Sequence, residues 1–229
     1  MNWKFINSPY LRFLKMYINE IFLSIQGEGL YSGEKMVFIR TEYCNLRCSW
    51  CDTKYSFYEG KEMSIDEIVE SARNINSGHG ASWICLTGGE PLLQKDISVL
   101  VDRLSEEYNI LLETSGSLDI GRFLPNHVKV KKDIDFKLPS SGMYRKFNDK
   151  NISYMEEGDY IKFVVNDLND FNVAMEEIEK IGKNVKIVVQ PVYGTDIKML
   201  ADAFIDKAPS NARLMLQEHK YIYGEIRGV

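Results

Sequence analysis

Short apolar runs alternate with amphipathic segments along most of this chain. Eight runs rich in aliphatic, β-branched and aromatic residues predict strands, and several are continuously apolar, as strands covered on both faces are. They span residues 17–25, 36–41, 83–87, 110–113, 128–137, 160–165, 185–190 and 213–217. The segments between them carry apolar residues every three or four positions, which is the spacing of one helix face. This alternation predicts an α/β fold of βα units around a parallel sheet.

Four apolar stripes predict the helix faces that pack on the sheet. Their members are Ile65, Ile68, Val69 and Ala72; Ile97, Leu100, Val101 and Leu104; Phe171, Ala174, Met175, Ile178 and Ile181; and Met199, Leu200, Ala203 and Phe204. The first of these helices opens with a capping box at residues 64–67. No linker rich in Pro, Gly or Ser divides the chain, so we expect one domain. About six parallel βα units predict an open partial barrel or a doubly wound sheet, and in both folds ligands gather at the carboxyl ends of the strands.

The composition fits a globular protein and narrows its partners. The chain has 229 residues, 45% of them hydrophobic, which is enough for one core without disulfides or a structural metal. Acidic residues outnumber basic ones by 33 to 28, so a nucleic-acid partner is not expected. No apolar run approaches the roughly 18 residues of a membrane helix, and the first residues lack the pattern of a signal peptide. We therefore expect a cytoplasmic protein that does not bind membranes.

Three of the four cysteines lie within eight residues, in the loop that follows the second predicted strand. Cys44, Cys48 and Cys51 form a Cys-x3-Cys-x2-Cys motif. Three thiolates leave one iron of a 4Fe-4S cluster open, because such a cluster normally takes four cysteines. An open iron suits a cluster that binds a chelating ligand such as S-adenosylmethionine.

Two other interpretations of these cysteines remain, a zinc site and a chance group of small buried thiols. A zinc site would need a fourth ligand from Cys85, His79, His127 or His219. Zinc sites usually combine two separated pairs of ligands, so the open iron-sulfur cluster is the favoured interpretation. Cys85 lies inside an apolar run at residues 83–86, and we expect it to be a buried core thiol.

A second motif follows the third predicted strand and reads Thr87-Gly88-Gly89-Glu90-Pro91. Together with the cysteine motif it resembles the radical S-adenosylmethionine superfamily. A narrower set of segments is similar to the 7-carboxy-7-deazaguanine synthase family. These segments are residues 20–29, 38–40, 51–53, 113–116, 135–137, 190–191 and 217–220. The resemblance implies a partial (β/α)6 TIM-like barrel in a single domain at residues 16–229, with residues 1–15 as an N-terminal extension.

The resemblance also implies an activity, that of a carbon–nitrogen lyase in deazapurine (queuosine) biosynthesis. Such enzymes convert 6-carboxy-5,6,7,8-tetrahydropterin to 7-carboxy-7-deazaguanine and release ammonia. A 5'-deoxyadenosyl radical abstracts the C6 hydrogen before the ring contracts. The implied cofactors are a 4Fe-4S cluster, S-adenosylmethionine and Mg²⁺. The implied partners are the small pterin substrate, a reducing flavodoxin or ferredoxin, and a second copy of the chain in a homodimer.

Site residues follow from the same resemblance. The cluster ligands are Cys44, Cys48 and Cys51. Substrate contacts are expected at Ile25, Gln26, Gly27, Glu28, Arg40 and Thr87. S-Adenosylmethionine contacts are expected at Trp50, Cys51, Asp52, Gly88, Gly89, Glu90, Ser115, Asp135, Phe136, Lys137, Gln190, Pro191, Val192 and Tyr193. Thr53 is expected to ligate Mg²⁺, and His219 and Lys220 could reach the mouth of the site.

The chemistry of these side chains fits a planar heterocycle that carries a carboxylate. The amide of Gln26 and the carboxylate of Glu28 could read a pyrimidine edge, although a polar turn between glycines would explain them too. The guanidinium fork of Arg40 matches a carboxylate, but an arginine that ends a strand can also lie at the surface. The Thr53 hydroxyl is a hard oxygen ligand suited to Mg²⁺, or it forms a local bond within a turn.

Two other functions fit parts of the pattern. An enzyme that activates a glycyl-radical partner would use the same cluster but has no need of the small-molecule set Gln26, Glu28, Arg40 and Thr53. A non-catalytic iron-sulfur electron carrier or sensor leaves both the open iron and the Gly-Gly-Glu-Pro stretch unexplained. The sequence therefore favours the lyase.

Overall fold

The computed structural model of the protein describes residues 14–124 and 130–229. Its strands form one nine-stranded sheet, in the order β3-β1-β2-β4-β5-β6-β7-β8-β9. Their bounds are β1 Lys15–Ile25, β2 Lys35–Thr41, β3 Lys61–Ser64, β4 Trp83–Gly88, β5 Asn109–Thr114, β6 Val130–Phe136, β7 Tyr160–Val165, β8 Lys186–Pro191 and β9 Ala212–Leu214. Each of the eight strands predicted from the apolar runs is present, but the last ends at Leu214 instead of residue 217, and residues 128–129 of the fifth lie outside the described residues.

The sequence pattern misses one strand, β3. It is a four-residue edge strand that begins with two exposed charged residues, Lys61 and Glu62, so no apolar run marks it. It pairs antiparallel with the start of β1, where Met16 lies opposite Met63 and is fully buried. Residues 1–13 of the predicted N-terminal extension lie outside the described residues, and the domain boundary stays a prediction.

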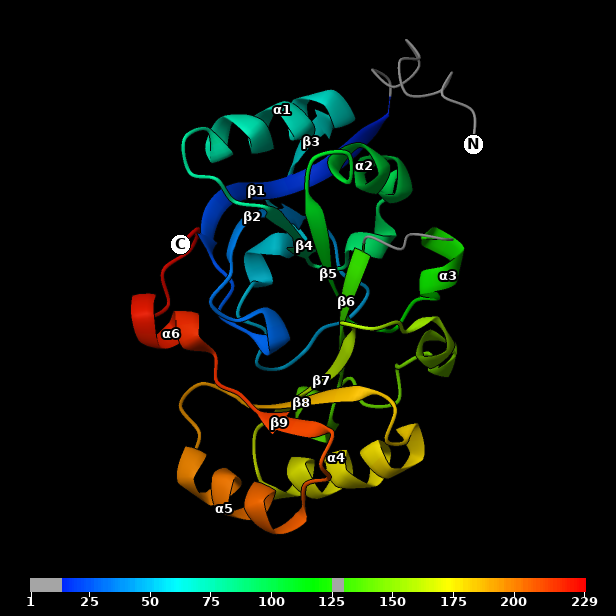
Figure 1. Ribbon diagram of the computed structural model, residues 1–229, viewed down its shortest axis with the longest axis vertical. Helices are drawn as coiled ribbons and strands as arrows, with labels where there is room; N and C mark the ends of the chain where they lie inside the picture. The colour runs from blue at the N-terminus through cyan, green and yellow to red at the C-terminus, as the bar shows by residue number, and fades with distance from the viewer. Residues whose placement is uncertain (1–13, 125–129) are drawn as a thin grey trace.

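The sheet combines two strand directions. From β2 through β4 to β9 each strand runs parallel to its neighbour, whereas β1 is antiparallel to β2 and to β3. The β1–β2 connection is a loop of residues 26–34 that contains the 3-10 helix η2 (Gly29–Tyr31), and so short a connection suits antiparallel neighbours. The sheet curves with its helices on the outer side (Figure 1). This is the partial TIM-like barrel expected from the sequence, rather than a doubly wound sheet.

The described ranges contain six α-helices, of which five lie between strands and α6 follows the last strand, β9. They are α1 Ile65–Asn76, α2 Ile97–Leu104, α3 Ile120–Phe123, α4 Leu168–Ile181, α5 Ile197–Lys207 and α6 Glu218–Tyr223. The predicted capping box is present at the start of α1, where Ser64 and Glu67 bond each other's backbone N–H. In this part of the chain, each helix is too short or too polar to cross a bilayer.

Three of the four predicted helix faces pack on the sheet as expected, and the fourth does so only in part. Leu200 of α5 is buried, but Met199 is 37% exposed. The reason is that α5 covers the edge of the sheet, where β9 has only three residues to pack against.

The core has two parts because side chains alternate along each strand. In β4, Ile84 and Leu86 point toward the helices and belong to the large outer core. Cys85 points inward and joins a smaller cluster with Phe38 and Leu111, which confirms the prediction of a buried core thiol. This inner cluster fills part of the curve, and a cavity occupies the rest.

Candidate active site

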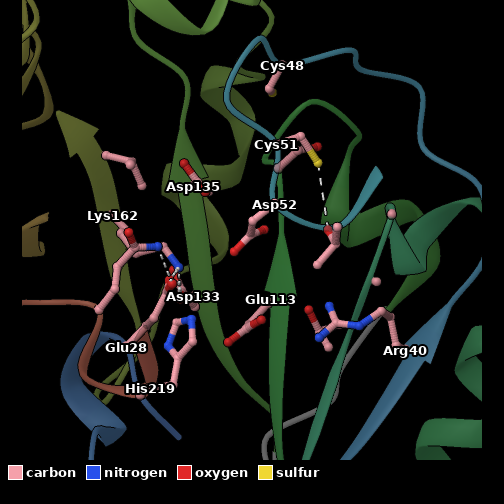
Figure 2. Close-up of a pocket in the computed structure, with 18 of the residues that line it drawn as sticks. Glu28, Arg40, Cys48, Cys51, Asp52, Glu113, Asp133, Asp135, Lys162 and His219 are labelled. Carbon is pink, nitrogen blue, oxygen red and sulfur yellow. Dashed lines mark hydrogen bonds and ion pairs between the residues drawn. The ribbon is translucent and has the colours of Figure 1, made fainter. Parts of the chain in front are cut away.

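A cavity of about 430 Å³ opens at the carboxyl ends of the parallel strands. Its size is that of a small-molecule site, and this edge is where barrels of βα units bind ligands. Cysteines lie on one side, and a cluster of carboxylates around Lys162 lies on the other, with Glu113 between that cluster and Arg40 (Figure 2). The cavity therefore joins the predicted cluster site to the predicted substrate residues.

The cysteine loop, residues 42–53, runs from the end of β2 to the 3-10 helix η3 (Lys54–Phe57). Cys44, Cys48 and Cys51 are half-buried and line the cavity. Burial raises the pKa of the Cys48 thiol to about 11, although nearby Lys137 opposes the effect. Thiolates in such a place need a cation beside them, and bound iron supplies one. The donor set therefore fits an iron-sulfur cluster.

Backbone contacts hold this loop at both ends. Tyr43 adopts a φ of 72°, in the left-handed region that non-glycine residues rarely enter. Its carbonyl accepts a hydrogen bond from the backbone N–H of Glu90 at 2.7 Å. Farther along, the N–H of Ser49 donates to the carbonyl of Ser141 at 3.0 Å, in the 3-10 helix η5 (Pro139–Ser141). The segments after β4 and β6 thus position the cysteines.

The structure bears on the zinc alternative through the candidate fourth ligands. Cys85 lies in the inner core and does not line the cavity, His79 is exposed, and His127 lies outside the described residues. His219 does line the cavity, but it lies beside Glu28, on the side away from Cys48 and Cys51 (Figure 2). Over residues 14–124 and 130–229, no three His, Cys, Asp or Glu side chains are gathered as one metal ion requires. Zinc sites usually combine two separated pairs of ligands, so the iron-sulfur cluster stays the favoured interpretation.

The end of β4 packs directly on the cysteine loop. Gly88 has a φ of 145°, and a Cβ on Gly89 would lie only 2.1 Å from the carbonyl oxygen of Tyr43. A Cβ on Gly88 would lie 2.4 Å from the carbonyl oxygen of Thr41, at the end of β2. Only glycine fits at these two positions, because a side chain would push away β2 or the loop that follows it. Thr87, Gly88 and Gly89 all line the cavity, next to the loop that carries the cysteines.

Glu90 has a supporting position. It is fully buried and does not line the cavity. Its carboxylate accepts hydrogen bonds from Thr114 Oγ1 at 2.8 Å and from the N–H and hydroxyl of Ser115 at 2.8 and 2.5 Å. Ser115 does line the cavity, so Glu90 fixes a residue that a ligand can touch.

The predicted substrate residues of the β1–β2 loop lie across the cavity from the cysteines. Gln26 Nε2 donates to Glu113 Oε1 at 2.8 Å, and Gln26 Oε1 accepts from the N–H of Glu28 at 3.1 Å. Glu28 in turn accepts from Lys162 Nζ at 2.8 Å and from Gln217 Nε2 at 2.9 Å. These side chains are held by a buried network and are not an unconstrained polar turn.

Lys162 of β7 lies at the centre of that network. Its ammonium also donates to Asp133 Oδ2 at 2.8 Å (Figure 2). Burial alone would lower the pKa of Lys162, but Asp133 and Glu28 hold it well above its usual range. Burial alone would likewise raise the pKa of Glu28, but Lys162 and His219 keep it well below its usual range. Lys162 is therefore a permanent cation and Glu28 a permanent hydrogen-bond acceptor.

Arg40 lines the cavity from β2 and is not the surface arginine that the alternative interpretation predicts. Its side chain is only 14% exposed, and its Nε donates to Glu20 Oε1 at 2.7 Å. Glu20 is the residue directly opposite on β1, so the pair is a cross-strand ion pair.

Thr53 also lines the cavity, at the N-cap of η3. Its side chain forms no capping hydrogen bond, and its Oγ1 lies 3.7 Å from Cys51 Sγ. The hydroxyl is thus directed to the cysteine side of the cavity. Its role as a magnesium ligand stays a prediction.

Most of the residues predicted to form the site meet in this one cavity. They are Ile25, Gln26, Gly27, Glu28, Arg40, Cys44, Cys48, Trp50, Cys51, Asp52, Thr53, Thr87, Gly88, Gly89, Ser115, Asp135, Lys137, Val192 and Tyr193, together with His219 and Lys220. Lys137 donates to Asp135 at 2.7 Å and lies 5.3 Å from the Trp50 ring centre, so these three form one side of the wall.

Four predicted cofactor contacts do not line the cavity: Glu90, Phe136, Gln190 and Pro191. The Phe136 ring stacks on Phe163 in the outer core, at 4.9 Å between ring centres. Gln190 is fully buried, and neither of its amide atoms has a hydrogen-bond partner among the described residues. A buried amide without a hydrogen-bond partner can bond a ligand or a bound water. The roles of these four residues as cofactor contacts stay predictions.

Sequence reasoning gave no role to Glu113, Asp133, Lys162 or Gln217, although all four line the cavity. A signal for two of them was available, because Glu113 and Lys162 are charged residues inside largely apolar strands, whereas the strand of Asp133 carries three other charged residues. A buried charge must be paired, so such a residue indicates either an ion pair or a site. The sequence does not show which residue each buried charge pairs with, because that depends on the order of the strands in the sheet.

The cavity, its three cysteines and the partial barrel define the class of protein. The profile of the Radical SAM superfamily matches residues 38–136, which span the cysteine loop, the end of β4 and β6. A structure of Streptococcus suis SuiB bound to S-adenosylmethionine has a similar fold, with a TM-score of 0.53 and 16% identity over 76% of this chain and 48% of that chain.

Comparisons over the whole chain identify a narrower family within this superfamily. The 7-carboxy-7-deazaguanine synthase of Thermoplasma acidophilum is 40% identical over 215 residues, which cover 93% of this chain and 100% of the relative. That of Methanospirillum hungatei is 38% identical over 209 residues, 90% of this chain and 85% of the relative. The crystal structure of QueE from Escherichia coli shares the fold, with a TM-score of 0.74 and 22% identity over 93% of this chain and 100% of that chain. The chain belongs to the 7-carboxy-7-deazaguanine synthase family, as its motifs predict.

Proposed function

We propose that this protein converts 6-carboxy-5,6,7,8-tetrahydropterin to 7-carboxy-7-deazaguanine with release of ammonia. One observation carries the proposal. Residues 25–28, Arg40 and the cysteine loop share a single cavity, in a chain 40% identical over 93% of its length to a 7-carboxy-7-deazaguanine synthase. The family assignment gives no support to the glycyl-radical activating enzyme or to the electron carrier.

The cofactors follow from the superfamily, which implies a 4Fe-4S cluster and S-adenosylmethionine. Cys44, Cys48 and Cys51 would hold the cluster, and the glycines at the end of β4 would lie beside the cofactor. When bound, these groups supply the radical chemistry that removes hydrogen from the substrate. The residues of the chain bind and orient the ligands and exclude water, which a carbon radical would otherwise meet.

The substrate side of the cavity suits a planar ring with several N–H donors. Glu28 is kept ionised, so it only accepts hydrogen bonds, and Gln26 is fixed by its bond to Glu113. The rings of Phe22 and Phe38 stack at 5.0 Å between centres and line the same cavity, so they offer an apolar surface to the ring. We assign the substrate carboxylate to Arg40, and the support is that this guanidinium lines the same cavity.

We extend the proposal to Mg²⁺ at Thr53, to a flavodoxin or ferredoxin as electron donor, and to a homodimer. The support for Thr53 is its hydroxyl, which lines the cavity without capping η3. The reductant and the homodimer follow from the family resemblance alone. The cytoplasmic location stays a prediction of the sequence.

An anaerobic assay tests the reaction. Reconstituted protein is given the carboxytetrahydropterin, S-adenosylmethionine, dithionite and Mg²⁺, and we expect a product with deazaguanine absorbance together with ammonia. Cys48→Ala should abolish the product and lower the iron content, whereas Cys85→Ala, the same change outside the loop, should keep its iron. Omission of Mg²⁺ should lower the rate. Cluster-loaded protein that forms neither product nor ammonia would contradict the proposal.

A further inference from the structure

Residues 224–229 follow α6 and lie against β1. We call these residues the strap. One residue, Arg227, makes most of the contacts. Its Nε donates to Glu20 at 3.0 Å, one terminal nitrogen donates to Glu59 at 2.8 Å, and the other donates to Asn19 at 2.9 Å. All three guanidinium nitrogens are thus engaged. Figure 1 shows this last segment, in red, returning to β1.

The strap also borders the cavity. Glu225 and Val229 are among its lining residues. Between them, the Arg227 guanidinium lies over the ring of Tyr55 at 3.9 Å from the ring centre, which is a close cation–π contact. Because Tyr55 belongs to η3, this contact joins the strap to the end of the cysteine loop.

Glu20 connects the strap to Arg40. One of its carboxylate oxygens accepts from Arg40 Nε at 2.7 Å and from the Tyr55 hydroxyl at 2.8 Å. The other oxygen accepts from Arg227 at 3.0 Å. The side chains of Arg40 and Glu20 are only 14% and 13% exposed, so water screens this pair little, whereas Arg227 is 42% exposed and meets Glu20 from the solvent side. Both oxygens are therefore occupied by fixed donors.

This sharing decides how Arg40 can bond. A carboxylate with two free oxygens pairs with arginine in a bidentate way and engages a terminal nitrogen as well as Nε. Here Arg227 occupies the second oxygen, and within the described ranges Arg40 forms hydrogen bonds through Nε alone. The two terminal nitrogens of Arg40 are left for a ligand in the cavity.

We propose that Arg227 and Glu20 are positioning residues, which together keep the guanidinium fork of Arg40 free for the substrate carboxylate and hold the strap at the cavity mouth. The inference rests on the proposed function, since that function supplies the carboxylate. Preorganisation of this kind raises affinity because the fork need not be released from Glu20 when the ligand arrives.

Measuring the binding of two ligands distinguishes a role of Arg227 in positioning Arg40 from a general structural role. Two probes are used on cluster-loaded protein, 6-carboxytetrahydropterin and tetrahydropterin without the carboxylate. Arg227→Ala should weaken binding of the first roughly tenfold, while binding of the second should change less than about twofold. In turnover, KM should rise with little change in kcat.

Arg227→Lys, which keeps a charged donor to Glu20, should recover part of the loss. Arg213→Ala, at an exposed arginine outside the cavity, should bind both probes as the wild type does.

Amide hydrogen exchange tests the strap without any ligand. The amides of residues 224–229 should exchange faster in Arg227→Ala and Glu20→Gln than in the wild type. Equal exchange rates would overturn the role of Arg227 in holding the strap. Equal loss of both probes, or no loss of either, would overturn the role in positioning Arg40. If wild-type protein fails to bind the carboxylated probe, the proposed function and the positioning of Arg40 fall together, and exchange alone decides the strap.

Discussion

Lys162 pairs with two carboxylates whose pKa values shift in opposite directions. It lies 2.8 Å from an oxygen of Glu28 and 2.8 Å from one of Asp133. Burial raises the pKa of Asp133 to about 7, with Lys162 opposing the shift and Glu113 adding to it. Glu28 stays ionised next to the same cation. The site therefore holds one carboxylate as a fixed acceptor and one that binds a proton below neutral pH.

This difference makes stability depend on pH. Folded Asp133 binds a proton between about pH 4 and 7, where the unfolded chain has lost it, so its contribution to stability falls as pH rises through that window. The wild type should thus lose on the order of 2 kcal/mol relative to Asp133→Asn from pH 5 to pH 8. Glu28 titrates below this range. Denaturant unfolding at both pH values measures the change. A flat difference for Asp133→Asn would mean that Asp133 is ionised throughout.

At the scale of elements, the cysteine loop takes its shape from the end of β4. Gly89→Ala would place a Cβ 2.1 Å from the carbonyl oxygen of Tyr43 and 3.0 Å from the Cβ of Cys44. We expect the loop to shift, so that iron content after anaerobic reconstitution falls below about half and stability falls by roughly 1–3 kcal/mol.

The matched control for this change is Gly182→Ala, at the end of α4. Gly182 has a φ of 91°, and a Cβ added there would have no other atom within 4 Å, so alanine meets only a conformational cost of about 1–3 kcal/mol. Iron content should stay at the wild-type level. Full iron loading of Gly89→Ala would show that the loop does not depend on β4.

The sequence predicts elements well where local chemistry decides them. Apolar runs mark every strand from β4 to β9, and the cysteine spacing marks the loop that borders the cavity. The sequence does not predict features that depend on which strands and helices lie side by side. The direction of β1 and the existence of β3 come from pairing at the sheet edge, and the exposure of Met199 comes from the short β9. The Lys162 network joins β6, β7 and the β1–β2 loop, which lie together only because of the strand order.

At the scale of the whole molecule, polar contacts close the gap of the open barrel. The backbone N–H of Glu218 donates to the carbonyl of Gly27 at 2.8 Å, and Gln217 bonds Glu28 across 189 positions of sequence. Figure 1 shows α6 between β1 and β9, at the place where further strands would complete a barrel. Three of these four residues, Gly27, Glu28 and Gln217, also line the substrate side of the cavity, so closure and ligand binding should be coupled.

Gly27 is where this coupling can be tested. A Cβ there would lie 2.6 Å from the backbone N of His219, so Gly27→Ala must separate the β1–β2 loop from α6. We expect a loss of roughly 1–3 kcal/mol in stability and the loss of most of the rise in Tm that 6-carboxytetrahydropterin gives the wild type. Gly78→Ala, at a φ of 79° with open space around it, should lose roughly 1–2 kcal/mol through backbone strain and keep the full ligand-induced rise. Thermal melting with and without the ligand measures both quantities. If Gly27→Ala loses stability but keeps the rise, the contact closes the fold without shaping the site, and ligand binding is independent of the gap between β1 and β9.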